Sequence, residues 1–207
     1  RIALGTRHSC VLLSPTSLKC WGQNGAGQLA IGTSIDQASP VASDLGGLSA
    51  KNVSAGSDHT CLHMTDDSIR CAGDQVYGQI GIGAGATSLN FVATDTLPGG
   101  VSAAAAVQAG LRNTCALLTD GSLTCWGANS DGQIGLTDLN NPQKSPPSSA
   151  LTFSGNPVKS FAVGGNRTCV ALEDGRAKCW GSNTYAQLGY DSAGKRIELA
   201  NAPDLPM

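Results

Sequence analysis

Short apolar runs separated by polar turns recur along the chain, and each turn is flanked by an apolar run on either side. In the third such stretch, residues 115–118 read "CALL" and residues 123–125 read "LTC", with "TDG" at 119–121. The equivalent first runs, "VLL", "LHM" and "VAL", are also apolar at successive positions. Strands of this kind suit a sheet covered on both faces, and a three-residue loop ending in Gly suits a bulged hairpin. The pattern predicts antiparallel hairpins packed between neighbouring sheets.

The hairpins recur at a nearly constant period. Aligning their first cysteines gives steps of 51, 54 and 54 residues. A period near 50 is typical of propeller blades and solenoid units. We expect one all-β repeat domain over residues 1–207, a β-propeller-type array of four blades. The repeats are centred on residues 5–32, 56–83, 110–136 and 164–190, and a glycine lies five positions before each first cysteine, at Gly5, Gly56, Gly110 and Gly164.

The hairpin register predicts how the eight cysteines pair. If residues 119–121 form the loop, Leu117 faces Leu123 and Cys115 faces Cys125. Directly opposed residues of an antiparallel pair have Cα atoms about 4.5–5.5 Å apart, which a disulfide accepts. Each disulfide closes a short loop and stabilises the fold by roughly 2.5–3 kcal/mol. The predicted disulfides are Cys10–Cys20, Cys61–Cys71, Cys115–Cys125 and Cys169–Cys179.

Zinc is the alternative use of eight cysteines. Structural zinc sites usually take cysteines two to four positions apart, so a spacing of ten across a hairpin favours disulfides. In the first two repeats Thr16 and Asp67 replace the loop glycine. There we expect the disulfide to compensate for a poorer turn.

Composition narrows the class of protein. An even number of eight cysteines favours an oxidising compartment, and 27 glycines with 4% aromatic residues fit many tight turns between short strands. The net charge is −2 and no run of Lys or Arg exceeds two, so a nucleic-acid partner is disfavoured. No apolar run approaches the roughly 20 residues that span a bilayer, so no membrane insertion is expected. Because the sequence opens at Arg1 without a signal peptide, we expect a processed or excised chain.

The segments "GLRNTCALLTDG" and "CWGANSDGQIG" together resemble the repeat of the regulator of chromosome condensation family. The similarity covers essentially the whole chain. The resemblance implies four-stranded blades, of which usually seven close a propeller. This sequence departs from the family pattern at Ala30, Ala72 and Ala186, which replace a Gly, a Trp and a Gly. The cysteine pairs are absent from nuclear members and make the chain similar to the secreted, disulfide-bearing variants.

The resemblance implies several functions, including nucleotide exchange on a small GTPase, chromatin docking and inhibition of a β-lactamase. The fold does not select among them. An exchange factor would act in the nucleus or cytosol, which the cysteine pairs disfavour. We therefore expect a non-enzymatic protein, located outside the cell, at the cell surface or in the periplasm.

Candidate chemical groups have structural interpretations. His8 and His59, two residues before a first cysteine, are expected to form structural hydrogen bonds, and His63 to be partly buried. "NSDG" lacks the ligand series of a calcium loop, and the glycine tails lack the Lys-Ser/Thr of a phosphate-binding loop, so no metal or cofactor is predicted. Asn52 and Asn166 begin glycosylation sequons. Carboxylates at the hairpin tips are interpreted as turn formers: Asp66, Asp67, Asp120, Glu173 and Asp174.

The loops that follow the hairpins are the candidate interaction surface. Between an Asn-like position and a Gly-Gln pair, an arrangement written here as "N-x-x-G-Q", the two middle residues differ between repeats while the scaffold around them stays fixed. Tyr77, Asp131 and Tyr185 occupy these positions and are predicted to bind a protein partner, the alternative being that they cover blade edges. Two other functions stay open: a regulator of an enzyme, either exchange-factor-like or a hydrolase inhibitor, and a self-assembling architectural subunit. We also expect the four blades to form an open arc, completed by further repeats or by another copy.

Overall fold

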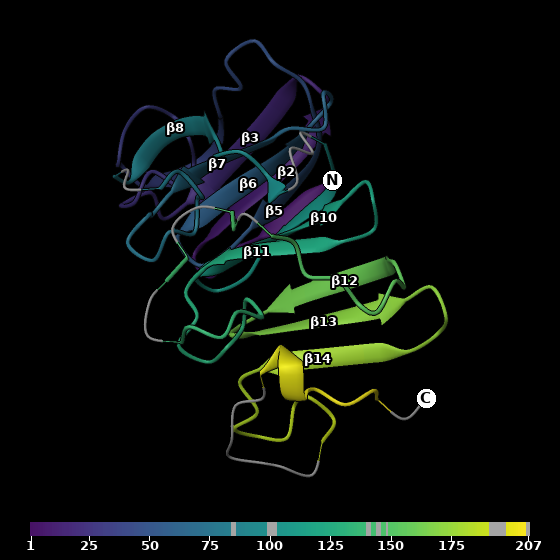
Figure 1. The fold of residues 1–207 in the computed structure, drawn as a ribbon. Coiled ribbons are helices and arrows are strands. Elements are labelled where there is room, and N and C mark those ends of the chain that lie inside the picture. Colours follow the sequence, from purple (N-terminus) through teal and green to yellow (C-terminus); the bar gives the residue numbers. More distant parts are fainter. Residues whose placement is uncertain are drawn as a thin grey trace.

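The computed structural model describes residues 1–83, 86–98, 103–139, 142–143, 146–147, 149–190 and 198–205. Its strands form four antiparallel sheets, here called blades 1 to 4 (Figure 1). Blade 1 comprises β1 (Ile2–Leu4), β2 (His8–Ser14), β3 (Ser17–Gly22) and β4 (Gln37–Ala42), and blade 2 comprises β5 (Ala50–Ala55), β6 (His59–Met64), β7 (Ile69–Gly73) and β8 (Ser88–Ala93). Blade 3 comprises β9 (Ala104–Ala109), β10 (Asn113–Leu118) and β11 (Leu123–Gly127), and blade 4 comprises β12 (Val158–Gly164), β13 (Arg167–Leu172) and β14 (Ala177–Gly181).

The register within each blade confirms the predicted hairpins and disulfides. In blade 3, Leu117 pairs with Leu123 and Cys115 with Cys125. All eight cysteines lie in four disulfides between the second and third strands of their own blade, and the Cα atoms of each pair are 4.1 Å apart. The cysteines therefore link strands inside blades and supply no zinc ligands.

The hairpin tips differ where the loop glycine is missing. Gly121 and Gly175 adopt the left-handed conformation, with φ of 80° and 89°, and Asp67 adopts it without being glycine, at 65°. Thr16 avoids it, because Ser14 pairs with Ser17 and the loop of blade 1 shortens to two residues. Loss of the glycine is therefore tolerated in two ways, by backbone strain in blade 2 and by a tighter turn in blade 1.

The blades follow one another along an arc in chain order, with the first strand of each nearest its neighbours' first strands (Figure 1). Each contact between consecutive blades, here called a seam, has its own apolar cluster. Met64 and Leu62 of β6 are buried toward blade 1, and every residue of β6 is buried. The prediction that hairpin strands are covered on both faces is therefore confirmed for β6 and for β10, whose residues are nearly all buried, but not for β2 and β13 in the first and last blades, which alternate between buried and more exposed residues.

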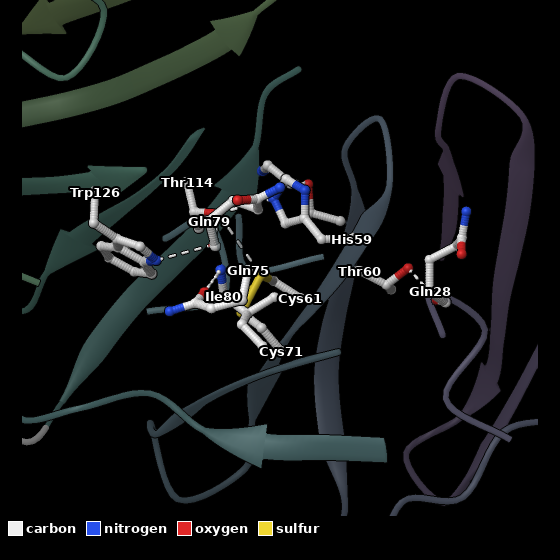
Figure 2. The surroundings of a disulfide bond; sticks show 12 residues. Gln28, His59, Thr60, Cys61, Cys71, Gln75, Gln79, Ile80, Thr114 and Trp126 are labelled. Carbon is white, nitrogen blue, oxygen red and sulfur yellow. Dashed lines mark hydrogen bonds between the residues drawn. A yellow bond between two sulfur atoms is a disulfide. The ribbon is translucent and has the colours of Figure 1, made fainter. Parts of the chain in front are cut away.

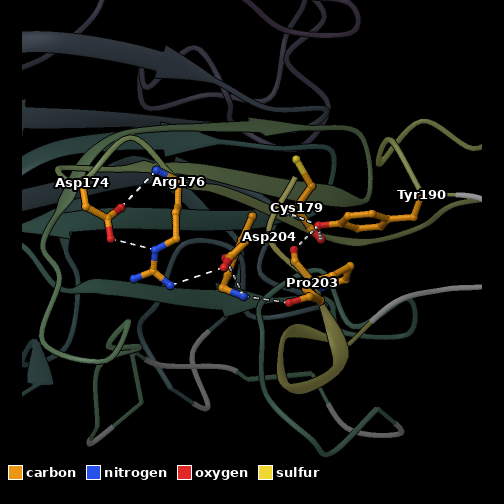
Figure 3. Close-up of polar contacts among 8 residues, drawn as sticks. Asp174, Arg176, Cys179, Tyr190, Pro203 and Asp204 are labelled. Atoms are coloured by element: carbon orange, nitrogen blue, oxygen red, sulfur yellow. Dashed lines mark hydrogen bonds and ion pairs between the residues drawn. The ribbon is translucent and has the colours of Figure 1, made fainter. Parts of the chain in front are cut away.

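The outer edge of blade 4 lacks a regular fourth strand among the described residues. Where β4 or β8 would pair, the hydroxyl of Tyr190 accepts a hydrogen bond from the Cys179 N–H (3.2 Å) and donates to the carbonyl of Pro203 (2.8 Å). The segment after the 3-10 helix η2 (Leu199–Asn201) is also held by Asp204, which forms ion pairs with Lys178 (3.0 Å) and Arg176 (3.4 Å). Figure 3 shows these contacts closing the outer edge of the last blade.

Candidate functional site: the loop face and the seams

The two ends of every blade differ in construction. At one end lie the hairpin tips, and at the other lie two sets of turns: those between the first and second strands, and those that follow the third strand. We call the end with these turns the loop face. The first set joins consecutive blades through backbone hydrogen bonds, from Thr6 N to the Gly56 carbonyl (3.3 Å), from Ser57 N to the Leu111 carbonyl (3.1 Å), and from Leu111 N to the Gly165 carbonyl (3.2 Å).

These turns surround a shallow hollow of about 280 Å³. All four blades contribute to its lining, which consists mainly of glycine, alanine and backbone atoms and includes Leu111. Leu111 keeps 37% of its surface exposed although it is apolar. The hollow therefore offers shape and backbone groups but no titratable side chain, so it is not built for acid–base chemistry.

The second set of turns explains why the "N-x-x-G-Q" pattern persists. Asn24 accepts a hydrogen bond from Leu29 N through Oδ1 (2.9 Å) and donates to the Thr33 carbonyl through Nδ2 (2.8 Å), so its side chain holds both ends of the turn. The Gln28 side chain accepts from Ala26 N (3.0 Å). Both side chains are fully buried. They hold the backbone in place, which leaves the residues between them free to differ.

Two of the three predicted partner-binding residues contact the next blade. Tyr77 of blade 2 accepts a hydrogen bond from Arg112 of blade 3 (3.3 Å), whose guanidinium also lies 4.9 Å from the centre of the tyrosine ring. Asp131 of blade 3 accepts one from Asn166 of blade 4 (2.7 Å). Tyr185 is 87% exposed. The variable position is thus at the edge of a seam, where it still faces solvent.

The predicted sequon residues lie in different settings. Asn166 uses its Nδ2 atom to hold Asp131, and a glycan would be attached to this same atom. Asn52 lies half-buried in β5, opposite His63. His63 itself is buried, with its Nε2 atom 3.2 Å from Asp67 Oδ1.

His8 and His59 are structural hydrogen-bonding residues of the seams, as predicted. The His8 Nε2 atom lies 2.8 Å from the Thr60 hydroxyl, which donates its own proton to the Gln28 carbonyl (2.7 Å). The hydroxyl must therefore accept from His8, which fixes the neutral tautomer that carries its proton on Nε2. His59, Thr114 and Gln79 repeat the arrangement between blades 2 and 3 (Figure 2).

Burial lowers the pKa of both histidines from 6.5. The pKa of His8 falls to about 4, because desolvation outweighs the nearby negative charge of Asp58. The pKa of His59 falls to about 3, through desolvation and then the proximity of His8. In each ring the Nδ1 atom is buried without a hydrogen-bond partner, so a proton there would be a buried, unpaired charge. Both rings are buried, and each is hydrogen-bonded to a threonine of the next blade.

A tryptophan and a glycine form the other half of the seam. Trp126 of blade 3 donates from Nε1 to the Gln79 carbonyl of blade 2 (3.1 Å; Figure 2). It also packs on Gly81, where an added Cβ would lie 2.7 Å from Nε1. Trp180 also lies beside Gly135, where an added Cβ would be 3.3 Å from its Nε1 atom, although Leu151 is nearer at 2.8 Å. Between blades 1 and 2 both residues change, so that Ala30 occupies the position of the glycine and Ala72 that of the tryptophan. The two departures from the repeat pattern therefore occupy the matched positions of one seam.

Three of the five hairpin-tip carboxylates act as turn formers, whereas Asp67 contacts Lys51 and His63. Asp66, Asp120 and Asp174 each accept a hydrogen bond from the backbone N–H two residues later. The hydrogen bonds to Ser68 lower the pKa of Asp66, and those to Ser122 lower the pKa of Asp120. Within the described residues no three His, Cys, Asp or Glu side chains gather as metal ligands. In the same part of the chain no helix has the length and apolar character needed to cross a membrane.

Models of the regulator of chromosome condensation (RCC1) repeat match the chain at residues 50–79, 104–133 and 158–187, and at 20–62 and 120–171. The ultraviolet-B receptor UVR8 of Arabidopsis thaliana is 27% identical over 190 residues, 91% of this chain and 42% of that protein. The X-linked retinitis pigmentosa GTPase regulator of Mus musculus is 29% identical over 147 residues, 68% of this chain and 14% of that protein. The chain therefore spans less than half the length of these curated relatives.

Among solved structures, Prp20p of Saccharomyces cerevisiae, described together with its binding to Gsp1p and histones, superposes with a TM-score of 0.84 at 20% identity. The match covers all of this chain and 50% of Prp20p. This likeness shows the fold.

Proposed function

Because the chain belongs to the RCC1 repeat family, we propose that it is a non-enzymatic, extracellular protein-interaction module that binds its partner through the loop face. One observation carries this proposal: on the loop face, buried residues such as Asn24 and Gln28 hold the turns, while the exposed residues between them differ from blade to blade. A rigid scaffold with varying loops is the usual construction of a protein-binding surface.

The side chains of the loop face suit a protein partner. Val76 is 67% and Tyr185 87% exposed, and Leu111 lines the hollow. Arg7 and Arg112 add exposed guanidinium groups on the same face. Aromatic and arginine side chains supply large contact area and dominate the energetics of many interfaces. The stacked Tyr77–Arg112 pair is already ordered, which reduces the entropy lost when a partner binds.

An oxidising location is supported by the cysteines. All eight are in disulfides, which persist outside the cell, at its surface or in the periplasm and are rare in the cytosol. The same observation bears on a second candidate function, regulation of a GTPase, which the name of the mouse relative suggests. GTPase regulation in the cytosol would require this fold to be stable with its cysteines reduced.

The binding test uses two leucines of similar exposure at opposite ends of the blades. Leu111 lies on the loop face and is 37% exposed, and Leu48 precedes β5 at the hairpin end and is 36% exposed. A partner is first identified by cross-linking to the purified natural chain. Compared with that chain, Leu111→Glu should capture at least about 10-fold less of this partner, and Leu48→Glu should capture the same amount. Equal capture by all three proteins, or loss only with Leu48→Glu, would place binding elsewhere. Acceleration of nucleotide release from a GTPase by the reduced chain would favour the second function.

A further inference from the structure

Arg112 is an exposed arginine of the loop face whose guanidinium is almost unpartnered. It lies in the turn between β9 and β10, and its Nη1 atom donates to the Tyr77 hydroxyl (3.3 Å). Among the described residues it takes part in no ion pair, unlike Arg176 of the last hairpin, which pairs with two carboxylates. Most of the N–H donors of this guanidinium therefore remain for a binding partner.

The carboxylates in the turns of the same face are already engaged. Each accepts a hydrogen bond from a donor of this chain: Asp58 from Ser57 (2.7 Å), Asp74 from Gln79 (2.8 Å) and Asp131 from Asn166 (2.7 Å). The chain thus satisfies the negative groups of the loop face and leaves a positive group without a counter-ion. This imbalance favours a partner that brings a negative charge to Arg112.

Tyr77 holds the guanidinium in place before any partner binds. The Arg112 Cζ atom lies 4.9 Å from the centre of the tyrosine ring, and the ring hydroxyl accepts from Nη1. The two residues belong to blades 2 and 3, each of which has a described blade on both sides (Figure 1). Stacking fixes the plane of the guanidinium and leaves Nε and Nη2 for a second contact. Less side-chain entropy is then lost on binding.

Apolar side chains lie on either side of this pair in the sequence. Val76 precedes Tyr77 and is 67% exposed, and Leu111 precedes Arg112, is 37% exposed and lines the hollow. An ion pair that stays fully hydrated contributes little to binding. An apolar side chain of the partner that covers Leu111 would exclude water from the neighbouring guanidinium and strengthen the pair. The surface therefore suits an acidic residue next to an apolar one, rather than an acidic residue alone.

We propose that Arg112 binds an aspartate or glutamate side chain of a protein partner, and that an apolar side chain beside this carboxylate packs on Leu111. The two oxygens of a carboxylate match the planar N–H donors of a guanidinium in a bidentate contact. A phosphate brings up to two negative charges, which the carboxylates Asp58, Asp74 and Asp131 of the same face disfavour. The inference rests on the proposed function, because it names the chemistry of the partner at the loop face.

A displayed library of random linear peptides tests this chemistry. Peptides selected on the natural chain should be enriched several-fold in Asp or Glu beside an apolar residue. They are then synthesised with amidated C-termini, so that side chains supply the only carboxylates. Arg112→Gln should weaken their binding by about 10-fold or more. Arg7→Gln is the matched control and should bind normally, because it removes the same charge from the same face at the equivalent turn position.

A double-mutant cycle identifies the bonded pair. Replacing the acidic residue of the peptide by its amide should weaken binding to the natural chain about as much as Arg112→Gln does, and should have little further effect on Arg112→Gln. Additive losses in this cycle, equal losses with Arg7→Gln and Arg112→Gln, or selected peptides without acidic residues would overturn the inference.

Leu111→Glu separates failure of this inference from failure of the proposed function. Peptides that bind Arg112→Gln normally and lose binding to Leu111→Glu would retain the loop face as the binding surface and remove Arg112 from it. Peptides that bind the natural chain and both variants equally would place binding elsewhere and overturn both proposals.

Discussion

The seam between blades 2 and 3 contains a histidine, a threonine and a tryptophan that meet at the Gln79 carbonyl. Each of the other two seams lacks either the histidine or the tryptophan. Between blades 2 and 3 the Gln79 carbonyl accepts from both Thr114 and Trp126, and His59 binds the same threonine. The seam between blades 1 and 2 keeps the histidine and loses the tryptophan. The seam between blades 3 and 4 keeps Trp180 and has Asn113 instead of histidine.

The comparison separates two contributions to blade packing. The Thr-to-Gln hydrogen bond occurs in all three seams, at 2.7–2.8 Å, and sets the distance between blades. The histidine and the tryptophan fill the space around it and can be replaced one at a time. In the seam between blades 3 and 4, the side chain of Asn113 and the Nε1 atom of Trp180 are buried without hydrogen-bond partners, so this seam is the least satisfied.

The largest expected effect is removal of the central indole. Trp126→Ala should lower the free energy of unfolding by about 3–5 kcal/mol, because the side chain is fully buried and would leave a cavity. Trp21→Ala in blade 1, where the indole is only partly buried, should cost roughly 1 kcal/mol or less. Urea unfolding of both variants makes the comparison, and similar losses would contradict the assignment of Trp126 to a closed seam.

A double-mutant cycle tests whether glycine and tryptophan are coupled. Gly81→Ala puts a Cβ against Trp126 and a side chain at a φ of 72°, so it should be strongly destabilising alone. In the Trp126→Ala background, Gly81→Ala recreates the Ala30–Ala72 combination. The loss of unfolding free energy that Gly81→Ala causes should then be smaller by at least about 1 kcal/mol. Additive costs would mean that the paired alanines of blades 1 and 2 are unrelated.

The order in which the disulfides are reduced should follow how deeply their cysteines are buried between blades. Cys61, Cys71 and Cys115 are fully buried between blades, whereas Cys169, in the last blade that the structure describes, is only half-buried. Limited dithiothreitol followed by alkylation and peptide mapping should therefore label Cys169 and Cys179 first. Loss of this disulfide should cost about 2–4 kcal/mol. Earlier labelling of Cys61 or Cys115 would contradict the order of protection.

The hairpins could be predicted from the sequence because their determinants are local. The loop and the cysteine spacing lie within about ten residues, so register and disulfides follow from one repeat. Seam partners lie much farther apart, as in Thr114 and Gln79, which are separated by 35 positions. The signal that could have revealed them was the paired loss of Gly and Trp at Ala30 and Ala72.

Residues at the loop tips were harder to interpret, since sequence alone does not distinguish a variable binding residue from a variable packing residue. Tyr77 and Asp131 contact the next blade, while Tyr185, in the last blade that the structure describes, is 87% exposed. The outer edge of blade 4 was unpredictable for a related reason. There a tyrosine hydroxyl and η2 take the place of a strand, and neither has an alternating pattern.

Lowering the pH should weaken the seam between blades 1 and 2 (the first seam) and that between blades 2 and 3 (the second), but not that between blades 3 and 4 (the third). The folded pKa values of His8 and His59, about 4 and about 3, lie below the 6.5 of an unfolded chain. As pH falls below about 6.5 the unfolded state takes up protons first, so stability falls by up to about 1.4 kcal/mol per pH unit for each histidine. The hairpin carboxylates, whose pKa values are lowered, lose their contribution only below about pH 4.

Urea unfolding at pH 7.5 and 5.5 measures this dependence. His59→Asn gives the second seam the residue that the third already has, and should remove about half of the pH dependence. An unchanged pH dependence in this variant would show that the buried imidazoles do not control acid sensitivity.

The smallest expected effect is a gain, from completing the seam between blades 3 and 4. Asn113→His should allow a hydrogen bond from Nε2 to the Thr168 hydroxyl, whose own proton goes to the Gln133 carbonyl (2.8 Å). The imidazoles of His8 and His59 pack closely on Gly5 and Gly56, and Gly110 provides the same surface below residue 113. One added hydrogen bond is worth about 1 kcal/mol, or roughly 2–4 °C in Tm.

Asn113→Ala is the control for this gain, because it removes the unpaired amide without supplying a donor. If the hydrogen bond stabilises Asn113→His, this variant should have a higher free energy of unfolding than Asn113→Ala at pH 7.5. The difference should disappear toward pH 5.5, because the imidazole of the unfolded chain takes up a proton there. An equal gain in both variants at both pH values would show that the unpaired amide alone weakened this seam. The histidine would then be a space-filling residue in the other two seams as well, with the threonine bonded to glutamine sufficient to hold neighbouring blades together.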